Sequence, residues 1–403
     1  MRTITQLTLL ATLLGACDVG DGDFEEEDGV DVGVLAAQGA STARTITTGT
    51  CTNTFEFEHE LVIRALEVVE DPARTTGAGV WTFGHLVAAL AGTRDPKALA
   101  KEWLETWRGS PVLNGEKIYG NASKVDDLLL GAWNGDGFAL EKAPFRLLAI
   151  VLRPDAPGGA ELRFVFGATS PAPQRVALPM NVAFEYRVSA AFMKKWHTTL
   201  RPLALGSAAY RDALALLTEE GIRDTTQLNN SSLVQLRTNE AAIDSPWDLR
   251  EFKLDATNGA TLQRAQLKGQ PKVKFDGDPR LASGVTPAME TYSAIIPSKD
   301  FAWNAPGLSG EDRFKFAMTT CAGCHAKETR TDFVHIKPRE AGERAKISSF
   351  LQSRTCEAGD AECTSMEQAG EFTDPIAPSH RFTTQDDRMV ALNKVLAAQN
   401  ACQ

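Results

Sequence analysis

Five consecutive residues near the end of the chain carry the clearest chemical signal: Cys321, Ala322, Gly323, Cys324 and His325. The pattern C-x-x-C-H is typical of c-type haem attachment, in which each thiol bonds to one vinyl group of the porphyrin. The adjacent histidine then binds the iron through an imidazole nitrogen. The sequence therefore predicts a covalently attached haem c, held by Cys321 and Cys324, with His325 as an axial iron ligand.

The second axial position has several candidates downstream. His335 follows His325 closely, with enough chain between them to pass around the porphyrin edge, and it is the favoured candidate. Met366 and His380 are the alternatives. Met389 falls within the expected final helix, so we expect it to pack in the core. The choice matters because a Met ligand raises the reduction potential relative to a second histidine.

The same residues allow a different metal. Cys321, Cys324, His325 and His335 would supply the four ligands of a structural zinc ion, so zinc is the alternative cofactor. A thioredoxin-like thiol pair fits less well, because that pair normally follows a strand and starts a helix. Here a helix is expected over 309–320, directly before the motif.

The N-terminal residues indicate export from the cytoplasm. Arg2 precedes an apolar run over 7–14, and Cys17 comes directly after Leu-Gly-Ala. A basic start, a short apolar stretch and small residues describe a secretory leader, and this one resembles a bacterial lipoprotein signal. We expect 1–17 to be the signal peptide, with lipidated Cys17 as the first mature residue. The protein would then be extracytoplasmic and lipid-anchored to the bacterial cell envelope, at its periplasmic face or cell surface.

Acidic residues are concentrated directly after this cysteine. The net charge of the chain is −10, and much of it lies within 18–31. Because this stretch has too little apolar content to offset its ordering entropy, we expect 18–50 to be an acidic disordered tether. Beyond it the charges are nearly balanced, and no basic patch indicates a nucleic-acid partner.

Cysteine usage predicts disulfides. Of the seven cysteines, four remain after lipid and haem attachment, and an even remainder in an exported protein favours two disulfides. Cys356 and Cys363 enclose a short polar loop and would pair most easily, which leaves Cys51 with Cys402. The other two connectivities stay open.

Hydrophobic periodicity divides the chain into two expected domains. Over 51–300, helical and strand-like runs follow each other without regular β-α-β order, which predicts an α+β domain. Expected helices cover 57–69, 81–91, 96–107, 190–200 and 208–220, and expected strands cover 145–152, 161–168, 181–187, 247–254 and 262–268. The first two strands should form a hairpin through the turn-rich 154–159. Residues 301–403 should form a small, mainly α, cytochrome c-like haem domain ending in a helix over 386–399.

Several segments resemble a family of uncharacterised bacterial lipoproteins that have a single C-x-x-C-H near the C-terminus. The resembling segments are 81–86, 143–149, 161–167, 236–240, 247–252, 328–329 and 333–339. Members of this family often have Asn-Arg-Ile-Asp after the first strand, where this chain has Leu152, Arg153, Pro154 and Asp155. A site formed there in relatives would be altered here. The resemblance implies a haem and no activity beyond it.

The remaining region has weaker signals. His59 and His85 lie in helical patterns and are expected to be structural, whereas His197 follows two lysines and is expected at the surface. Another polar cluster consists of Arg237, Asn239 and Glu240. It could bind a ligand, but we expect it to be a hydrogen-bonded helix end. The sequence contains none of the motifs of phosphate loops, serine hydrolases, zinc proteases or dinucleotide-binding folds.

These observations predict a membrane-anchored monohaem c-type cytochrome-like lipoprotein that transfers electrons to a redox partner protein. One alternative is a non-redox surface or binding lipoprotein with a Cys/His zinc site. Another is a haem-dependent oxidoreductase in which 51–300 binds a substrate that the sequence does not identify.

Overall fold

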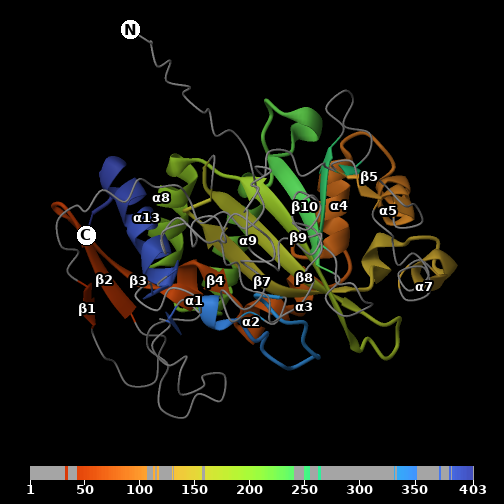
Figure 1. Ribbon diagram of the computed structural model, residues 1–403, viewed down its shortest axis with the longest axis horizontal. Coiled ribbons are helices and arrows are strands. Elements are labelled where there is room, and N and C mark those ends of the chain that lie inside the picture. The colour runs from red at the N-terminus through yellow and green to blue at the C-terminus, as the bar shows by residue number, and fades with distance from the viewer. Residues whose placement is uncertain are drawn as a thin grey trace, which may run out of the picture.

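The fold combines helices with antiparallel sheets, which confirms the mixed α and β content expected for the N-terminal region (Figure 1). The computed structural model describes residues 32–34, 43–106, 112–113, 116–117, 129, 131–156, 159–239, 249–254, 262–264, 331, 334–351, 372–373, 381–382 and 384–402. The C-x-x-C-H motif and the helix expected before it lie outside these ranges.

The main sheet of the described residues has seven strands in the order β12-β11-β10-β9-β8-β7-β4, and each neighbouring pair is antiparallel. These strands are β4 (Val62–Ile63), β7 (Phe145–Arg153), β8 (Glu161–Thr169), β9 (Ala177–Arg187), β10 (Leu233–Asn239), β11 (Leu249–Leu254) and β12 (Leu262–Arg264). The hairpin expected from the first two long strands is confirmed as β7-β8. Smaller sheets contain β1 (Val32–Val34), β2 (Ala43–Thr48) and β3 (Cys51–Glu56), then β5 (Val112–Leu113) and β6 (Glu116–Lys117), then β13 (Phe372–Thr373) and β14 (Arg381–Phe382).

The helices are mostly short and have local sequence signals at their ends. The α-helices are α1 (Phe57–Glu60), α2 (Leu66–Val69), α3 (Pro72–Thr75), α4 (Phe83–Ala91), α5 (Pro96–Glu105), α7 (Gly131–Gly135), α8 (Ala190–Leu200), α9 (Ala208–Gly221) and α13 (Thr384–Ala398). Short 3₁₀ helices are η3 (Leu140–Lys142), η4 (Leu228–Asn230) and η8 (Ser349–Leu351). Thr82, Asp95, Ser189 and Ser207 each accept a hydrogen bond from a backbone N–H in the first turn, so α4, α5, α8 and α9 begin where a capping side chain stands.

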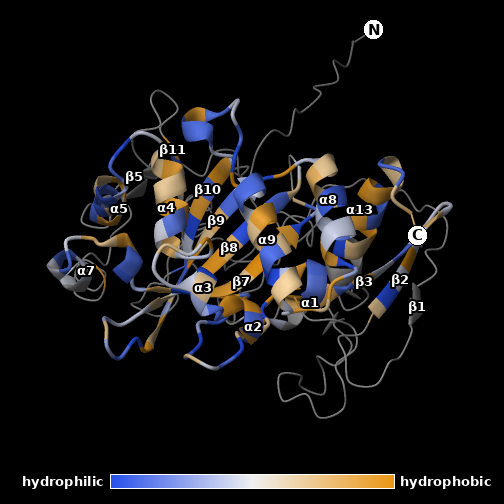
Figure 2. Ribbon diagram, turned by 180° about the vertical axis from the view of Figure 1, so that it is seen from behind, coloured by the Kyte–Doolittle hydropathy of each residue, from blue (hydrophilic) through white to orange (hydrophobic). Residues whose placement is uncertain are grey.

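One face of the main sheet is apolar and is covered by helices. Residues alternate between the two faces along each strand, and the apolar side includes Phe145, Phe166 and Phe184. Phe83 of α4 stacks on Phe145 with ring centroids 4.1 Å apart and meets the other two rings edge-on. Helices α4 and α9 both cross this side of the sheet (Figure 2).

The single helix expected over 57–69 is wrong. The structure has α1, then the short strand β4, then α2. Val62 and Ile63 are β-branched and pair with Val151 and Ile150 of β7, so strand pairing replaces helix in the middle of this run.

The tether expected over 18–50 ends earlier than predicted. Residues 43–48 form β2, which pairs with β3 along its whole length, and the side chains of Arg44 and Ile46 are buried. The β-branched residues in this run favour an extended strand, and pairing with β3 buries alternate side chains.

The described residues beyond 300 share the core of the main sheet and its helices. Ile336, Ile347, Phe350, Met389 and Leu392 belong to the same buried cluster as the main sheet and its helices. Helix α13 packs against α8, β2 and β3. Among the described residues, the boundary expected between 300 and 301 therefore does not separate two cores.

The end of the chain is joined covalently to its folded start. Cys51 of β3 and Cys402 form a disulfide with their Cα atoms 5.1 Å apart, and the C-terminus lies beside β2 (Figure 1). Asn53 donates a hydrogen bond of 2.7 Å to the side chain of Asn393 in α13, which in turn donates to the Cys51 carbonyl. These contacts hold α13 against β3.

Mass spectrometry of a non-reduced digest should therefore find the Cys51 peptide linked to the Cys402 peptide. The other expected disulfide, Cys356–Cys363, lies outside the described residues and is predicted to appear in the same digest. A reduced digest, in which both links are lost, is the control. Free thiols at Cys51 and Cys402 in natively exported protein would contradict the pairing.

Candidate functional site

Most of the residues predicted to bind haem lie outside the described part of the chain. They are Cys321, Cys324, His325, Met366 and His380. The predicted lipidation site Cys17, the predicted disulfide Cys356–Cys363 and Glu240 also lie outside it. Two of the candidate ligands are described. Met389 is 0% exposed within α13, which confirms its expected place in the core.

The second described candidate, His335, is half-buried and oriented by hydroxyl groups. Its Nδ1 atom lies 2.8 Å from Oγ of Ser348 and 3.2 Å from Oγ1 of Thr331, and its ring packs beside Phe350 at 5.2 Å. Histidines that bind metals usually have their second ring nitrogen hydrogen-bonded in this way. The two hydroxyl groups therefore fix the orientation of the His335 ring.

The segment that carries His335 is fixed to the main sheet by buried arginines. Arg339 donates a 3.0 Å hydrogen bond to the Leu147 carbonyl of β7 and pairs with Glu70. Burial lowers the pKa of Arg339 below its ordinary value. Arg64 donates a 2.6 Å hydrogen bond to the Ala345 carbonyl. These contacts give the backbone that follows His335 a defined position.

A second arrangement of functional side chains lies on the face of the sheet opposite Phe83. We call it the charged cluster, and its members are Arg153, Asp155, Glu161, Arg163, Glu185, Gln235, Arg237 and Arg388. Strand register explains the grouping, because Arg163 is opposite Glu185 and Arg153 is opposite Glu161. Directly opposite residues of antiparallel strands point to the same side of the sheet.

Glu185 is the centre of this cluster and is only 1% exposed. It accepts a 2.7 Å hydrogen bond from Gln235, and its carboxylate oxygens lie 3.4 Å from Arg163 and 3.6 Å from Arg237. Arg163 also donates to Glu161 at 2.6 Å. Buried charges are tolerated only when they are paired and hydrogen-bonded, so these side chains form one interdependent network.

The network lowers the pKa values of two of its acids, Glu161 and Asp155. Burial alone would raise the pKa values of Glu161 and Asp155, but neighbouring arginines hold both pKa values below their ordinary range. For Glu161 these arginines are foremost Arg163 and Arg153, and for Asp155 they are Arg388 and Arg153. Both acids therefore stay ionised at neutral pH. Arg388 belongs to α13, so the cluster also ties the last helix to the sheet.

The charged cluster and the His335 segment lie against the same face of the sheet. Asn181 of β9 donates a 2.5 Å hydrogen bond to the Ile336 carbonyl, next to His335. Asn181 and Glu185 are four residues apart on β9, so their side chains point to the same side. Any ligand held by His335 would be near this polar surface.

One prediction about these residues is corrected by the fold. Arg237 and Asn239, expected at a helix end, lie on strand β10 between β9 and β11. The alternation in 233–239 was the signal for a strand. In the segment that departs from the family pattern, Arg153 and Asp155 join the charged cluster, whereas Leu152 is buried in the core.

For two other histidines, one prediction is confirmed and one is wrong. His59 is buried, and its Nε2 lies 2.7 Å from the Leu203 carbonyl, as a structural histidine should. His197, expected at the surface, is only 2% exposed, and its Nδ1 lies 2.6 Å from the buried carboxylate of Glu60. Helix α8 places its lysines outward and turns this histidine toward α1.

Comparison with known proteins gives no assignment: no model of a protein family, no curated protein and no solved structure matches the chain. Over the described ranges, no three or more His, Cys, Asp or Glu side chains gather in a way that could hold a metal ion. None of the helices in those ranges is both long and apolar enough to cross a membrane.

Proposed function

We propose that this chain is a lipid-anchored, extracytoplasmic protein that carries one haem c and transfers single electrons. The observation that carries the proposal is the Cys321–Cys324–His325 attachment motif. When bound, the haem supplies a one-electron iron couple whose potential is set by its axial ligands and surroundings. His325 is the first axial ligand and His335 the second.

Three features of the described residues support the proposal. Nδ1 of His335 is hydrogen-bonded to Ser348, which suits iron binding through Nε2. Arg339 and Arg64 fix the segment that bears His335, so the ligand is positioned before the haem binds. The charged cluster on the same face contains four arginines and three carboxylates, so its net charge is positive, which favours nearby anionic groups such as haem propionates.

The proposal gives each part of the chain a role. Residues 1–17 direct export, lipid on Cys17 anchors the protein, and the acidic residues before β2 keep the folded part away from the membrane. The 301–403 region is cytochrome c-like in carrying the haem, and it rests on the main sheet through its 334–351 segment and α13. The partner is a redox protein.

A second candidate function is a haem-dependent oxidoreductase. The favouring observation is the hydrogen bond from Asn181 to the Ile336 carbonyl, which puts the charged cluster and the His335 segment on one face. In that case the charged cluster would form one wall of a substrate site within reach of the haem. Electron transfer without a bound substrate requires no such role for the cluster.

The absorbance spectrum of protein matured in a host that attaches c-type haem tests the proposal and the sixth ligand together. Wild-type protein should show low-spin haem. His335→Ala should convert it to high-spin haem or recruit water, because Nε2 is lost, whereas Met366→Ala should leave the spectrum unchanged.

Other outcomes of this experiment would indicate a different sixth ligand or a different metal. A far-red ferric band that disappears in Met366→Ala would show that sulfur is the sixth ligand. If neither substitution alters a low-spin spectrum, His380 becomes the ligand to test. Folded wild-type protein with no haem and one bound zinc ion would contradict electron transfer and support the zinc-held binding lipoprotein.

A further inference from the structure

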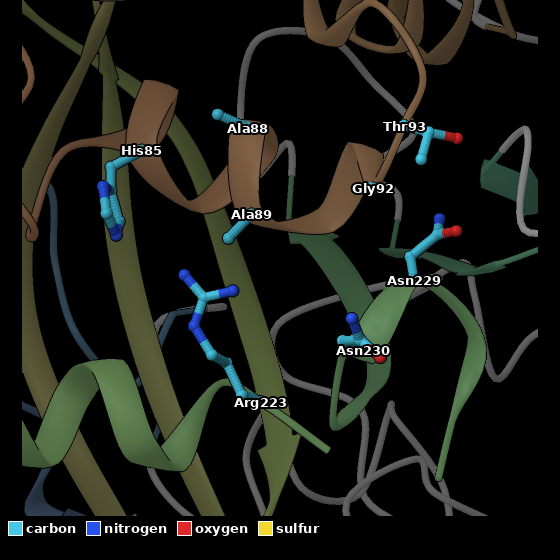
Figure 3. A pocket seen from close by; sticks show the side chains of 8 residues that line it. All are labelled: His85, Ala88, Ala89, Gly92, Thr93, Arg223, Asn229 and Asn230. Atoms are coloured by element: carbon cyan, nitrogen blue, oxygen red, sulfur yellow. The ribbon is translucent and has the colours of Figure 1, made fainter. Parts of the chain in front are cut away.

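A polar pocket of about 510 Å³ lies on the helical side of the main sheet, away from the charged cluster (Figure 3). Its floor is formed by the small residues Ala88, Ala89 and Gly92 along α4. Its other lining residues are polar, namely His85, Thr93, Arg223, Asn229 and Asn230. The volume is in the range typical of pockets that bind small organic molecules, and it exceeds what a simple inorganic anion needs.

The wall at the end of α4 is built from residues with unusual backbone conformations. Gly92 ends the helix with φ of 62°, and Asn229 and Asn230 have φ of 57° and 52°. The Asn229 side chain donates a 3.0 Å hydrogen bond to the Leu90 carbonyl. A Cβ atom on Gly92 would come within 2.8 Å of the Asn229 side chain, so the close contact needs glycine.

The opposite wall is organised by one carboxylate. Glu219 of α9 accepts a 3.1 Å hydrogen bond from Arg223, and its other carboxylate oxygen lies 2.6 Å from Nε2 of His85. Glu219 itself does not line the pocket, whereas His85 and Arg223 do. In Figure 3 the Arg223 guanidinium extends from below toward α4, between His85 and Asn230. Glu219 thus orients the side chains of His85 and Arg223 toward the pocket.

We propose that this pocket binds a small hydroxylated organic molecule that bears a carboxylate or a phosphate group. The lining contains a guanidinium and an imidazole but no carboxylate. Arginine pairs with carboxylate and phosphate oxygens through charge-assisted hydrogen bonds. The amides of Asn229 and Asn230 and the hydroxyl of Thr93 both donate and accept, which suits ligand hydroxyl groups.

This inference is independent of the proposed electron transfer. The pocket is formed by α4, the end of α9 and η4, and none of its lining residues belongs to the charged cluster or to the His335 segment. If the protein binds haem but no ligand in this pocket, the electron-transfer proposal stands and the pocket proposal fails. If it binds a pocket ligand but no haem, the opposite holds.

Isothermal titration calorimetry on the full chain, with glucuronate, glucose 6-phosphate and glucose as probes, tests the proposal. We expect saturable binding of glucuronate, of glucose 6-phosphate, or of both, and at least about tenfold weaker binding of glucose, since it lacks the charged group. Binding of one charged probe alone identifies carboxylate or phosphate as the recognised group. Absence of binding by both charged probes, or equal binding of glucose, would overturn the proposal.

Matched variants locate the binding site. Arg223→Gln should weaken binding by about tenfold or more through loss of the charged donor, and Asn230→Asp should weaken it by charge repulsion. Both residues are exposed, so neither change should unfold the protein. Lys195→Gln is the control, because Lys195 also pairs with a glutamate of α9, Glu220, outside the pocket. Unchanged affinity in Arg223→Gln, or an equal loss in Lys195→Gln, would refute this site.

Discussion

Replacing Arg163 by Met is expected to lower the free energy of unfolding by about 3–5 kcal/mol near neutral pH. Arg163 lies between Glu161 and Glu185, and both carboxylates are buried. Removing the guanidinium leaves two buried negative charges with one counter-charge fewer, while methionine fills most of the vacated volume. Urea denaturation followed by circular dichroism measures the change.

The loss of stability in Arg163→Met should become smaller at low pH. The pKa of Glu161 is held below its ordinary value of 4.5, so the stabilisation of its ionised form is present above that pH and is lost as the pH falls through the folded-state value. The difference between wild type and Arg163→Met should therefore shrink below about pH 4.5. Lys195→Met, which removes an exposed ion pair with Glu220, should cost at most about 1 kcal/mol. Similar losses in both variants would contradict the buried network.

Replacing Arg339 by Leu is expected to cost about 3 kcal/mol, because charge-assisted hydrogen bonds are lost and a buried carbonyl is left without its donor. Arg339 is buried and bonds the Leu147 carbonyl of β7 as well as Glu70. Its loss should also loosen the segment that carries His335. Urea denaturation measures the stability, and amide hydrogen exchange over 334–347 should become faster than in the wild type.

A second arginine on the same segment provides the control. Arg344 is 39% exposed and pairs with Glu58, so Arg344→Leu should cost no more than about 1 kcal/mol. If Arg339→Leu leaves both the stability and the exchange of this segment unchanged, the buried guanidinium does not anchor it, and the proposed preorganisation of His335 is wrong.

Local sequence signals predicted the long elements well. The strands β7 and β8 and the helices α4, α5, α8 and α9 all lie where periodicity and capping residues indicated. These elements have clear apolar spacing, and the four helices start at Ser, Thr or Asp. The strand β2 was missed although its partner β3 follows it directly. The strands β4 and β10 were missed, because their partners β7 and β9 lie far away in the sequence. Strand pairing of this kind is a tertiary effect that propensity does not contain.

The candidate sites were only partly predictable. His335 could be named from its spacing to His325, but its hydroxyl partner Ser348 became visible only in the fold. The charged cluster was not foreseen, because Arg237 is on β10, which pairs with β9 across a long stretch of chain that includes α8 and α9. Alternation of charged and apolar residues marked β8 and part of β9 singly. It did not show that these charges would meet in one buried cluster.

Covalent attachment of haem is the central claim, and extraction with acid–acetone tests it most directly. Protein matured in a host that attaches c-type haem is precipitated, and the haem absorbance of the pellet is measured. The account predicts that the Soret band stays with the polypeptide in the wild type and is lost in Cys321→Ala/Cys324→Ala. A folded wild-type protein whose pellet has no haem absorbance, and which contains one zinc ion per chain, would contradict it.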